Sequence, residues 1–149
     1  MGADSPSSGV DGNRTDDDPR TAPLRILVVD DDPAVLDSMR FILELDCHEV
    51  TTVAGGRAGI DAFAGAQATD APFGLVITDF SMPDVDGDAV AAAVKRLAPT
   101  TPVILITASH VRLAAGRDRP AGIDVMIGKP VPDTALRDAI LSCARASGA

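Results

Sequence analysis

The stretch Ile26-Leu-Val-Val-Asp-Asp-Asp-Pro33 contains a short apolar run that is followed at once by three acids and a proline. An unbroken run of aliphatic and β-branched residues is typical of a strand buried on both faces, as in the interior of a parallel sheet. Asp32 and Pro33 are an N-cap residue and a first-turn proline of the kind that begins many helices. The stretch therefore predicts a buried strand, a turn that carries carboxylates, and a helix.

Three more apolar runs repeat this pattern, and we expect each to be a strand buried on both faces: Leu75–Ile77, Val103–Ile106 and Val125–Ile127. A fifth run, Glu49–Val53, is more polar and is expected at an edge of the sheet. Apolar residues at helical spacing follow the five strands, and the fourth of these segments is the weakest: Val35–Leu43, Ile60–Phe63, Val90–Leu97, His110–Arg117 and Leu136–Leu141.

Strand and helix thus alternate five times, which is the pattern of an α/β fold with a parallel sheet and right-handed crossovers. Five such units favour a flavodoxin-like, doubly wound sheet with the strand order 2-1-3-4-5 and five helices. Ligands of these sheets bind at the carboxyl ends of the strands, beside the point where the strand order reverses.

The chain has 149 residues, the size of one domain. Residues 1–23 contain no Leu, Ile or Phe and many Asp, Ser, Pro and Gly, so we expect an acidic, disordered N-terminal tail. One folded domain is expected over residues 24–146, with no output domain after it.

The net charge of −9 disfavours direct binding to nucleic acid, because a phosphate backbone would be repelled. No apolar run is long enough to cross a membrane and no signal pattern begins the chain, so we expect a soluble, cytoplasmic protein. Cys47 and Cys143 match no disulfide framework or metal spacing, and we interpret both as packed free thiols.

Polar residues stand at the point where four of the predicted strands end: Asp30-Asp31-Asp32, Thr78-Asp79, Thr107-Ala108 and Gly128-Lys129-Pro130. In a parallel sheet all of these positions share one edge. We therefore expect three carboxylates, a hydroxyl and an ammonium to meet in one patch.

Carboxylates so close together require a proton or a cation between them. Two like charges about 4 Å apart repel by roughly 4 kcal/mol at an effective dielectric constant near 20. Carboxylate oxygens with open positions beside them suit Mg²⁺. A nucleophilic carboxylate beside such a metal suits phosphoryl transfer, where Lys129 could supply a second cation and Thr107 a hydroxyl donor.

Four segments together resemble the receiver domain of response regulators in two-component systems: Ile26–Pro33, Val76–Gly87, Ile104–Ala108 and Ala121–Pro130. They occur in the order and at the spacing of that family, and the resemblance extends from Leu24 to Ala146. It implies a signalling switch and not an enzyme.

The resemblance also implies roles in phosphoryl transfer. Asp79 matches the phosphoacceptor, which takes a phosphoryl group from a sensor histidine kinase or a histidine phosphotransfer protein. Thr107 matches the switch hydroxyl and Lys129 the phosphate-binding lysine. Pro130 matches a proline whose peptide bond is cis.

A magnesium site is implied as well. Asp31 matches a direct Mg²⁺ ligand, and Asp30 matches an acid that acts mainly through water. Asp79 and the backbone carbonyl of Ser81 complete the site. On phosphorylation, the surface formed by residues 110–117, 125–127 and 136–141 is expected to switch and to signal to an unidentified partner protein.

The sequence departs from the family at Met126, where receivers commonly carry Tyr or Phe. Methionine can fill a pocket but cannot present a ring to a partner. Ser81 and Ser109 occupy variable positions flanking the site. Their small size leads us to expect a phosphoryl lifetime that is not especially long.

Other polar residues have simpler interpretations. We expect a solvated loop at Asp84, Asp86 and Asp88, and a turn at Ala54–Gly59. His48 and His110 have no metal-ligating partners at suitable spacing and are expected at the surface.

Two other functions stay open at this point. Phosphatases of the haloacid-dehalogenase type also use an aspartate nucleophile with Mg²⁺ and carry a second Asp two residues later. The run Asp30-Asp31-Asp32 has that spacing, but it leaves Asp79 without a role. A degenerate receiver would bind partners without being phosphorylated. The intact acidic pair, Thr107 and Lys129 argue against this alternative, whereas Met126 keeps it open.

Overall fold

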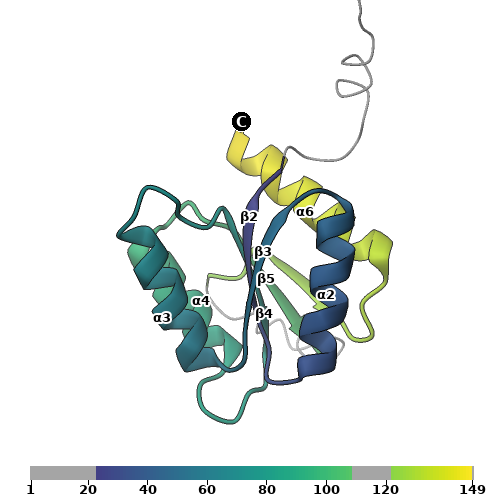
Figure 1. The fold of residues 1–149 in the computed structure, drawn as a ribbon, viewed down its shortest axis with the longest axis horizontal. Helices are drawn as coiled ribbons and strands as arrows, with labels where there is room; N and C mark the ends of the chain where they lie inside the picture. Colours follow the sequence, from purple (N-terminus) through teal and green to yellow (C-terminus); the bar gives the residue numbers. More distant parts are fainter. Residues whose placement is uncertain (1–22, 109–121, 149) are drawn as a thin grey trace, which may run out of the picture.

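Five parallel strands form one sheet at the centre of the computed structural model, which describes residues 23–108 and 122–148 (Figure 1). The spatial order is β3-β2-β4-β5-β6, which confirms the expected order 2-1-3-4-5. The strands are β2 (Arg25–Val29), β3 (Glu49–Val53), β4 (Leu75–Asp79), β5 (Val103–Thr107) and β6 (Val125–Gly128).

The described part of the chain contains four helices: α2 (Pro33–Leu45), α3 (Gly56–Gln67), α4 (Gly87–Leu97) and α6 (Asp133–Gly148). Helices α3 and α4 cover one face of the sheet, and α2 and α6 cover the other (Figure 1). None of these helices is both long and apolar enough to span a membrane. Residues 1–22 of the expected tail, Ser109, and the helix expected at 110–117 with His110 lie outside the described residues.

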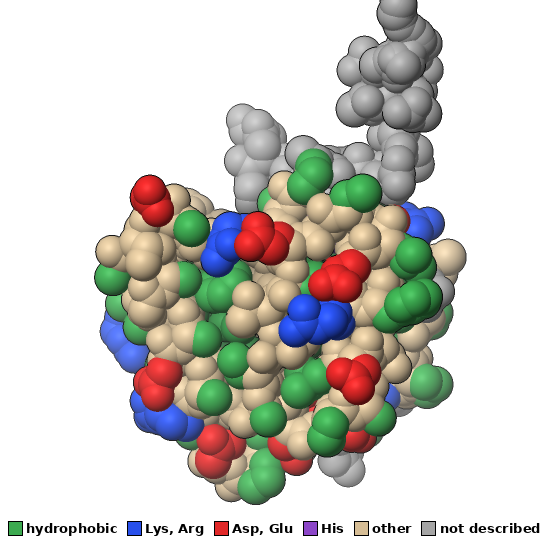
Figure 2. All heavy atoms as spheres, in the orientation of Figure 1, with side chains coloured by type: hydrophobic (Ala, Val, Ile, Leu, Met, Phe, Trp, Pro, Cys, Tyr) green, Lys and Arg blue, Asp and Glu red, His purple; other side chains and the backbone are tan. Residues whose placement is uncertain are grey.

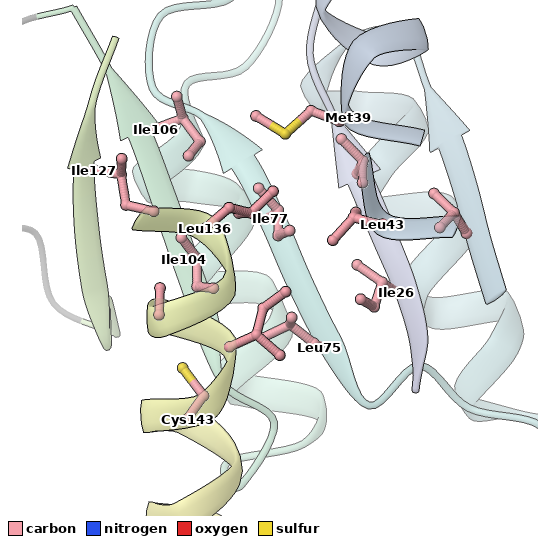
Figure 3. Close-up of a cluster of buried hydrophobic side chains, with 14 of the residues drawn as sticks. Ile26, Met39, Leu43, Leu75, Ile77, Ile104, Ile106, Ile127, Leu136 and Cys143 are labelled. Carbon is pink, nitrogen blue, oxygen red and sulfur yellow. The ribbon is translucent and has the colours of Figure 1, made fainter. Parts of the chain in front are cut away.

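A hydrophobic cluster packs on each face of the sheet. On one face α2 contributes Met39 and Leu43 and α6 contributes Leu136 (Figure 3). They pack against strand residues such as Ile26 and Ile77, and all five side chains are at most 4% exposed. Because helices cover both faces, each central strand carries an unbroken apolar run with polar residues only near its ends, which is the pattern in the sequence.

The two edge strands are less buried than the three central ones. Strand β3 is mostly half-buried, as expected from its polar sequence. Strand β6 forms the opposite edge, and Val125 and Met126 are half-buried there. The expectation that β6 is buried on both faces was therefore wrong, because an edge strand has a neighbouring strand on one side only.

Helix α2 begins where the sequence predicted. The carboxylate of Asp32 accepts a hydrogen bond from the backbone N–H of Ala34 at 3.0 Å, and Pro33 is the first helical residue. The cap satisfies one of the N–H groups that the first turn leaves without a helical partner. The short turn between β2 and α2 keeps Asp30 and Asp31 at the end of the sheet.

The turn after α2 contains a buried histidine. His48 is 6% exposed, and its Nδ1 accepts the backbone N–H of Leu24 at 3.0 Å. The expected surface position was therefore wrong. Cys47, beside it, has φ +69° and is exposed, whereas Cys143 is buried and its pKa is raised to about 11 by burial. Both thiols are free as expected, but only Cys143 is packed.

Candidate functional site

Four strands end level with one another at one edge of the sheet. The ladders place Asp79 opposite Ile106 and Thr107 opposite Gly128. Asp30 follows β2, whose neighbour β4 ends at Asp79. Figure 2 shows acidic side chains along the lower rim of the molecule, where the ribbon of Figure 1 has the carboxyl end of β2.

Three carboxylates gather at this edge. One oxygen from each of Asp30, Asp31 and Asp79 lies within 4.8 Å of the others. Asp30 is 2% exposed and Asp79 is 5% exposed, whereas Asp31 faces solvent. Two of the acids are thus held where water screens their charges poorly, and the third is open to approach from outside.

Lys129 brings its ammonium to two of these carboxylates. Its Nζ lies 2.9 Å from Oδ1 of Asp79 and 3.7 Å from Oδ2 of Asp30. The backbone N–H of Lys129 donates to the carbonyl of Thr107 at 3.1 Å, which ties the end of β6 to the end of β5. The peptide bond between Lys129 and Pro130 is cis, as the resemblance implies.

Burial and neighbouring charge shift two pKa values in the cluster. Burial is the main cause that raises the pKa of Asp30, and Asp79 adds to it, although an N–H donated by Asp32 at 2.9 Å opposes the rise. Burial lowers the pKa of Lys129, but the hydrogen bond and attraction to Asp79, with Asp30 and Asp31, outweigh it and raise the pKa overall. The cluster therefore favours a charged lysine and resists full ionisation of Asp30.

Thr107 and Ser81 complete the set of predicted site residues. Thr107 is 2% exposed and ends β5, next to the end of β4. Ser81 is exposed and lies two residues beyond Asp79, in the loop that joins β4 to α4. The structure thus gathers Asp30, Asp31, Asp79 and Lys129 in one cluster, with Thr107 and Ser81 on the adjoining segments.

Gly87 lets the loop after Asp79 close tightly. Its N–H donates to the carbonyl of Phe80 at 2.7 Å. A Cβ atom on Gly87 would lie 2.3 Å from the carbonyl oxygen of Asp79 and 2.9 Å from Cα of Phe80. Only glycine permits this approach, so Gly87 sets the geometry of the loop.

The donor set fits a small, hard divalent cation. Three carboxylates face one ammonium, so the cluster keeps an excess of negative charge even with Lys129 in place. Carboxylate oxygens are the ligands that Mg²⁺ prefers, and the exposed Asp31 leaves room for the waters that it retains.

A family model described as the response regulator receiver domain matches residues 26–141 of the chain. The chain belongs to this family. Receiver domains are signalling switches and not classical enzymes.

Curated relatives of this receiver domain include longer proteins. It is 35% identical over 105 residues to the transcriptional regulatory protein TcrA of Mycobacterium tuberculosis, a match that covers 70% of this chain and 38% of that protein. It is 31% identical over 121 residues to the transcriptional regulatory protein FixJ of Bradyrhizobium diazoefficiens, covering 80% of this chain and 56% of the relative. The matched region is thus only part of each relative.

Solved receiver structures share the fold. A response regulator receiver domain protein from Clostridium thermocellum superposes with a TM-score of 0.72 at 27% identity, covering 83% of this chain and 96% of that one. The response regulator protein TrrA from Thermotoga maritima, solved in complex with Mg(2+)-BeF, gives 0.69 at 27% identity, covering 80% and 97%.

Met126 is where this receiver domain departs from the aromatic residue common in the family. It pairs with Leu105 across the ladder between β5 and β6 and packs against the apolar cluster on the side of α3 and α4. Met126 is half-buried in this structure.

Asp84 is a receiver residue whose contacts the sequence reasoning missed. Asp84 is exposed, as expected of a solvated loop, but its carboxylate also accepts the backbone N–H groups of Gly56 and Arg57. These bonds, that from Arg57 foremost, lower its pKa. A signal did exist: α3 begins after Gly55, which has no side chain to cap it, so the cap has to come from elsewhere. Asp86 and Asp88 are exposed, as expected.

Proposed function

We propose that this receiver domain accepts a phosphoryl group on Asp79 from the phosphohistidine of a sensor histidine kinase or a histidine phosphotransfer protein. The observation that carries the proposal is the contact of Lys129 Nζ with Oδ1 of Asp79 at 2.9 Å, inside a cluster of three carboxylates. The two free thiols are compatible with a reducing cytoplasm as the place of this reaction.

Asp79 acts as the nucleophile. A carboxylate oxygen attacks phosphorus as the bond between phosphorus and the donor histidine nitrogen breaks, and an acyl phosphate forms. The released imidazole keeps the electron pair of the broken bond and takes up a proton from solvent. Lys129 transfers its ion pair from the Asp79 carboxylate to the oxygens of the incoming group, which offsets their negative charge.

The acidic pair would hold Mg²⁺, Asp31 as a direct ligand and Asp30 mainly through water, together with Asp79 and the carbonyl of Ser81. Bound there, the metal would neutralise charge on the phosphoryl group and align it with the nucleophile. Asp30 is suited to its part because the N–H of Asp32 fixes one of its oxygens at 2.9 Å.

The donor protein would dock on α2 and on the loop after β6. An apolar groove of about 510 Å³ runs between them, lined by α2 residues such as Val35 and Ile42 and by Lys129–Val131. Lys129 both lines this groove and contacts Asp79, so a helix seated in the groove would present a phosphohistidine beside the acceptor.

Phosphorylation replaces the charge of the Asp79 carboxylate by a phosphoryl group that carries about −1.5 to −2, and it adds three acceptor oxygens. The hydroxyl of Thr107 is the donor that would turn toward one of them. We propose that this biases the surface formed by residues 110–117, β6 and α6 toward a state that a downstream protein recognises. Met126 replaces the usual ring in this response by a flexible side chain.

The test is incubation with acetyl phosphate and MgCl₂, followed by intact-mass analysis. One added phosphoryl group is expected in the wild type and in Asp88→Asn, an exposed acid outside the cluster, and none in Asp79→Asn. No added mass in the wild type would favour a receiver that only binds partners. Sustained turnover of p-nitrophenyl phosphate would favour a phosphatase instead.

A further inference from the structure

The first turn of helix α3 lies between two loops of the candidate site. On one side, Oδ1 of Asp84 accepts the N–H of Gly56 at 3.1 Å and Oδ2 accepts the N–H of Arg57 at 3.0 Å. Asp84 belongs to the loop between β4 and α4, so it caps a helix that begins 28 residues earlier in the sequence. The cap is therefore a tertiary contact and not a local one.

On its other side the same turn is bonded to the strand end that carries the acidic pair. The N–H of Gly55 donates to the carbonyl of Asp30 at 3.3 Å, and the N–H of Asp30 donates to the carbonyl of Val53 at 3.2 Å. The turn from Gly55 to Arg57 thus links the backbone of Asp30 to the carboxylate of Asp84.

The turn and the loop pack so closely at Gly56 that a side chain there would clash with Val85. A Cβ atom on Gly56 would lie 2.4 Å from the carbonyl oxygen of Val85 and 2.8 Å from its Cβ. At its base the loop is closed by the bond from Gly87 N–H to the carbonyl of Phe80. The segment that contains Ser81 is therefore anchored at both ends, at Phe80 and at Asp84.

We propose that Asp84 is a positioning residue for the metal site, which holds the Ser81 segment in register with Asp30 and thereby sets the affinity for Mg²⁺. The inference rests on the proposed function, because it assigns the Ser81 carbonyl to the metal. Asp84 does not touch the reacting groups. Its effect passes through the backbone of the α3 turn and the loop.

Two variants separate position from charge. Asp84→Ala removes the cap and one negative charge, whereas Gly56→Ala keeps the charge and pushes Val85 away. Their matched controls are Asp86→Ala, which removes an exposed acid without a side-chain cap bond in the same loop, and Gly65→Ala, since nothing lies within 4 Å of a Cβ at that position of α3. Asp84→Asn, which keeps one acceptor oxygen, is an intermediate case.

The measurement is titration with MgCl₂ followed by amide chemical shifts, without any phosphoryl donor, together with hydrogen exchange at Gly56 and Arg57. Partners outside the ligand set typically change metal affinity by about 10–100-fold. We expect Asp84→Ala and Gly56→Ala to raise the Kd for Mg²⁺ roughly 10-fold, Asp84→Asn to raise it less, and the two controls to change it less than about 2-fold. Exchange at Gly56 and Arg57 should accelerate in Asp84→Ala.

The outcomes distinguish the two proposals. If Asp84→Ala and Asp86→Ala weaken the affinity for Mg²⁺ equally, the effect comes from charge alone. If Asp84→Ala lowers the Tm but leaves the Kd for Mg²⁺ unchanged, the cap is purely structural. Either result overturns the positioning role while Asp79 is still phosphorylated. A wild type that binds no Mg²⁺, or that is phosphorylated equally well without it, overturns the proposed magnesium site and this inference with it.

Discussion

Lys129 controls the charge balance of the candidate site. Its ammonium lies 2.9 Å from Asp79 and 3.7 Å from Asp30, and its side chain is 30% exposed. It is therefore close enough to both acids to offset their repulsion and open enough to follow an incoming phosphoryl group. Its pKa is raised, so it stays charged across the neutral range.

Replacing Lys129 by methionine keeps most of the side-chain volume and removes the charge. We expect the rate of phosphorylation by acetyl phosphate to fall by about 10²-fold, the usual effect of removing one preorganised donor to developing negative charge. The rate is read from the time course of the added mass at saturating MgCl₂. Arg57→Met removes an exposed cation near the same end of the sheet and should leave the rate within about 2-fold; an equal loss in both variants would contradict a direct role for Lys129.

Residues at strand ends could be predicted from sequence because a parallel sheet places them on one edge regardless of their separation along the chain. Asp30, Asp79 and Lys129 were found in this way. The cap that Asp84 forms could not be predicted in this way, because its partners are backbone N–H groups, which nearly every residue carries. His48 was misplaced for the same reason: it is buried against the backbone N–H of Leu24.

At the scale of elements, the junction between β4 and α4 depends on the absence of a side chain at Gly87. A Cβ atom on Gly87 would lie 2.3 Å from the carbonyl oxygen of Asp79, so only glycine fits at this position of the loop. The strands were predictable because buried strands leave unbroken apolar runs, and their order was predictable because five alternating strand-helix units favour one doubly wound arrangement. The exposure of β6 was not, because a short apolar run looks the same in a central strand and in an edge strand.

Gly87→Ala should therefore destabilise the fold. Forcing a methyl group against the backbone of Asp79 is expected to cost about 1–3 kcal/mol in the free energy of unfolding. Gly65→Ala, in the open middle of α3, should instead stabilise by up to about 1 kcal/mol. Urea denaturation followed by circular dichroism measures both, and the prediction fails if the two variants shift stability in the same direction.

The turn between α2 and β3 gives the fold a dependence on pH. Burial lowers the pKa of His48 below its ordinary value of 6.5, although Asp46 opposes the shift. The unfolded chain therefore binds more protons than the folded one below pH 6.5. The stability that the neutral, buried His48 contributes is fully present above pH 6.5. It is lost as the pH falls toward the lower pKa that His48 has in the folded state.

We expect the free energy of unfolding to decrease below pH 6.5 with a contribution from His48 of at most about 1.4 kcal/mol per pH unit. Denaturation of the wild type and of His48→Gln between pH 5 and pH 8 isolates this contribution, since all other titrating groups are common to both. Parallel stability profiles would show that His48 is not responsible.

At the scale of the whole molecule, the sheet carries helices on both faces and concentrates polar chemistry at one edge. The interior is mostly apolar, and Asp30 and Asp79 are among the few polar or charged residues that the described part of the chain buries. The chain has a net charge of −9, and three of its acidic residues lie together at this edge. Cation binding there should stabilise the entire fold, because the cluster exists only when β2, β4 and β6 are assembled.

Addition of MgCl₂ should therefore raise the Tm, and removal by EDTA should reverse the effect. At a free concentration about 100 times the Kd, the stabilisation amounts to about 2.7 kcal/mol. Asp31→Ala should lose most of this gain, while a wild type in NaCl of equal ionic strength controls for general screening. The same rise in Tm with NaCl as with MgCl₂ would contradict a specific site.

The lysine of the site directly follows β6, far along the chain from the aspartates. On the ribosome, Asp30 and Asp79 emerge well before Lys129. A nascent chain that has emerged only through β5 already contains the aspartates of the site, but it lacks both Lys129 and the strand β6 that precedes this lysine. The full cluster of charges thus forms only after the chain has been synthesised through Lys129. If Asp79 is the phosphoacceptor as proposed, we expect copies that end before Lys129 not to divert phosphoryl groups from longer ones.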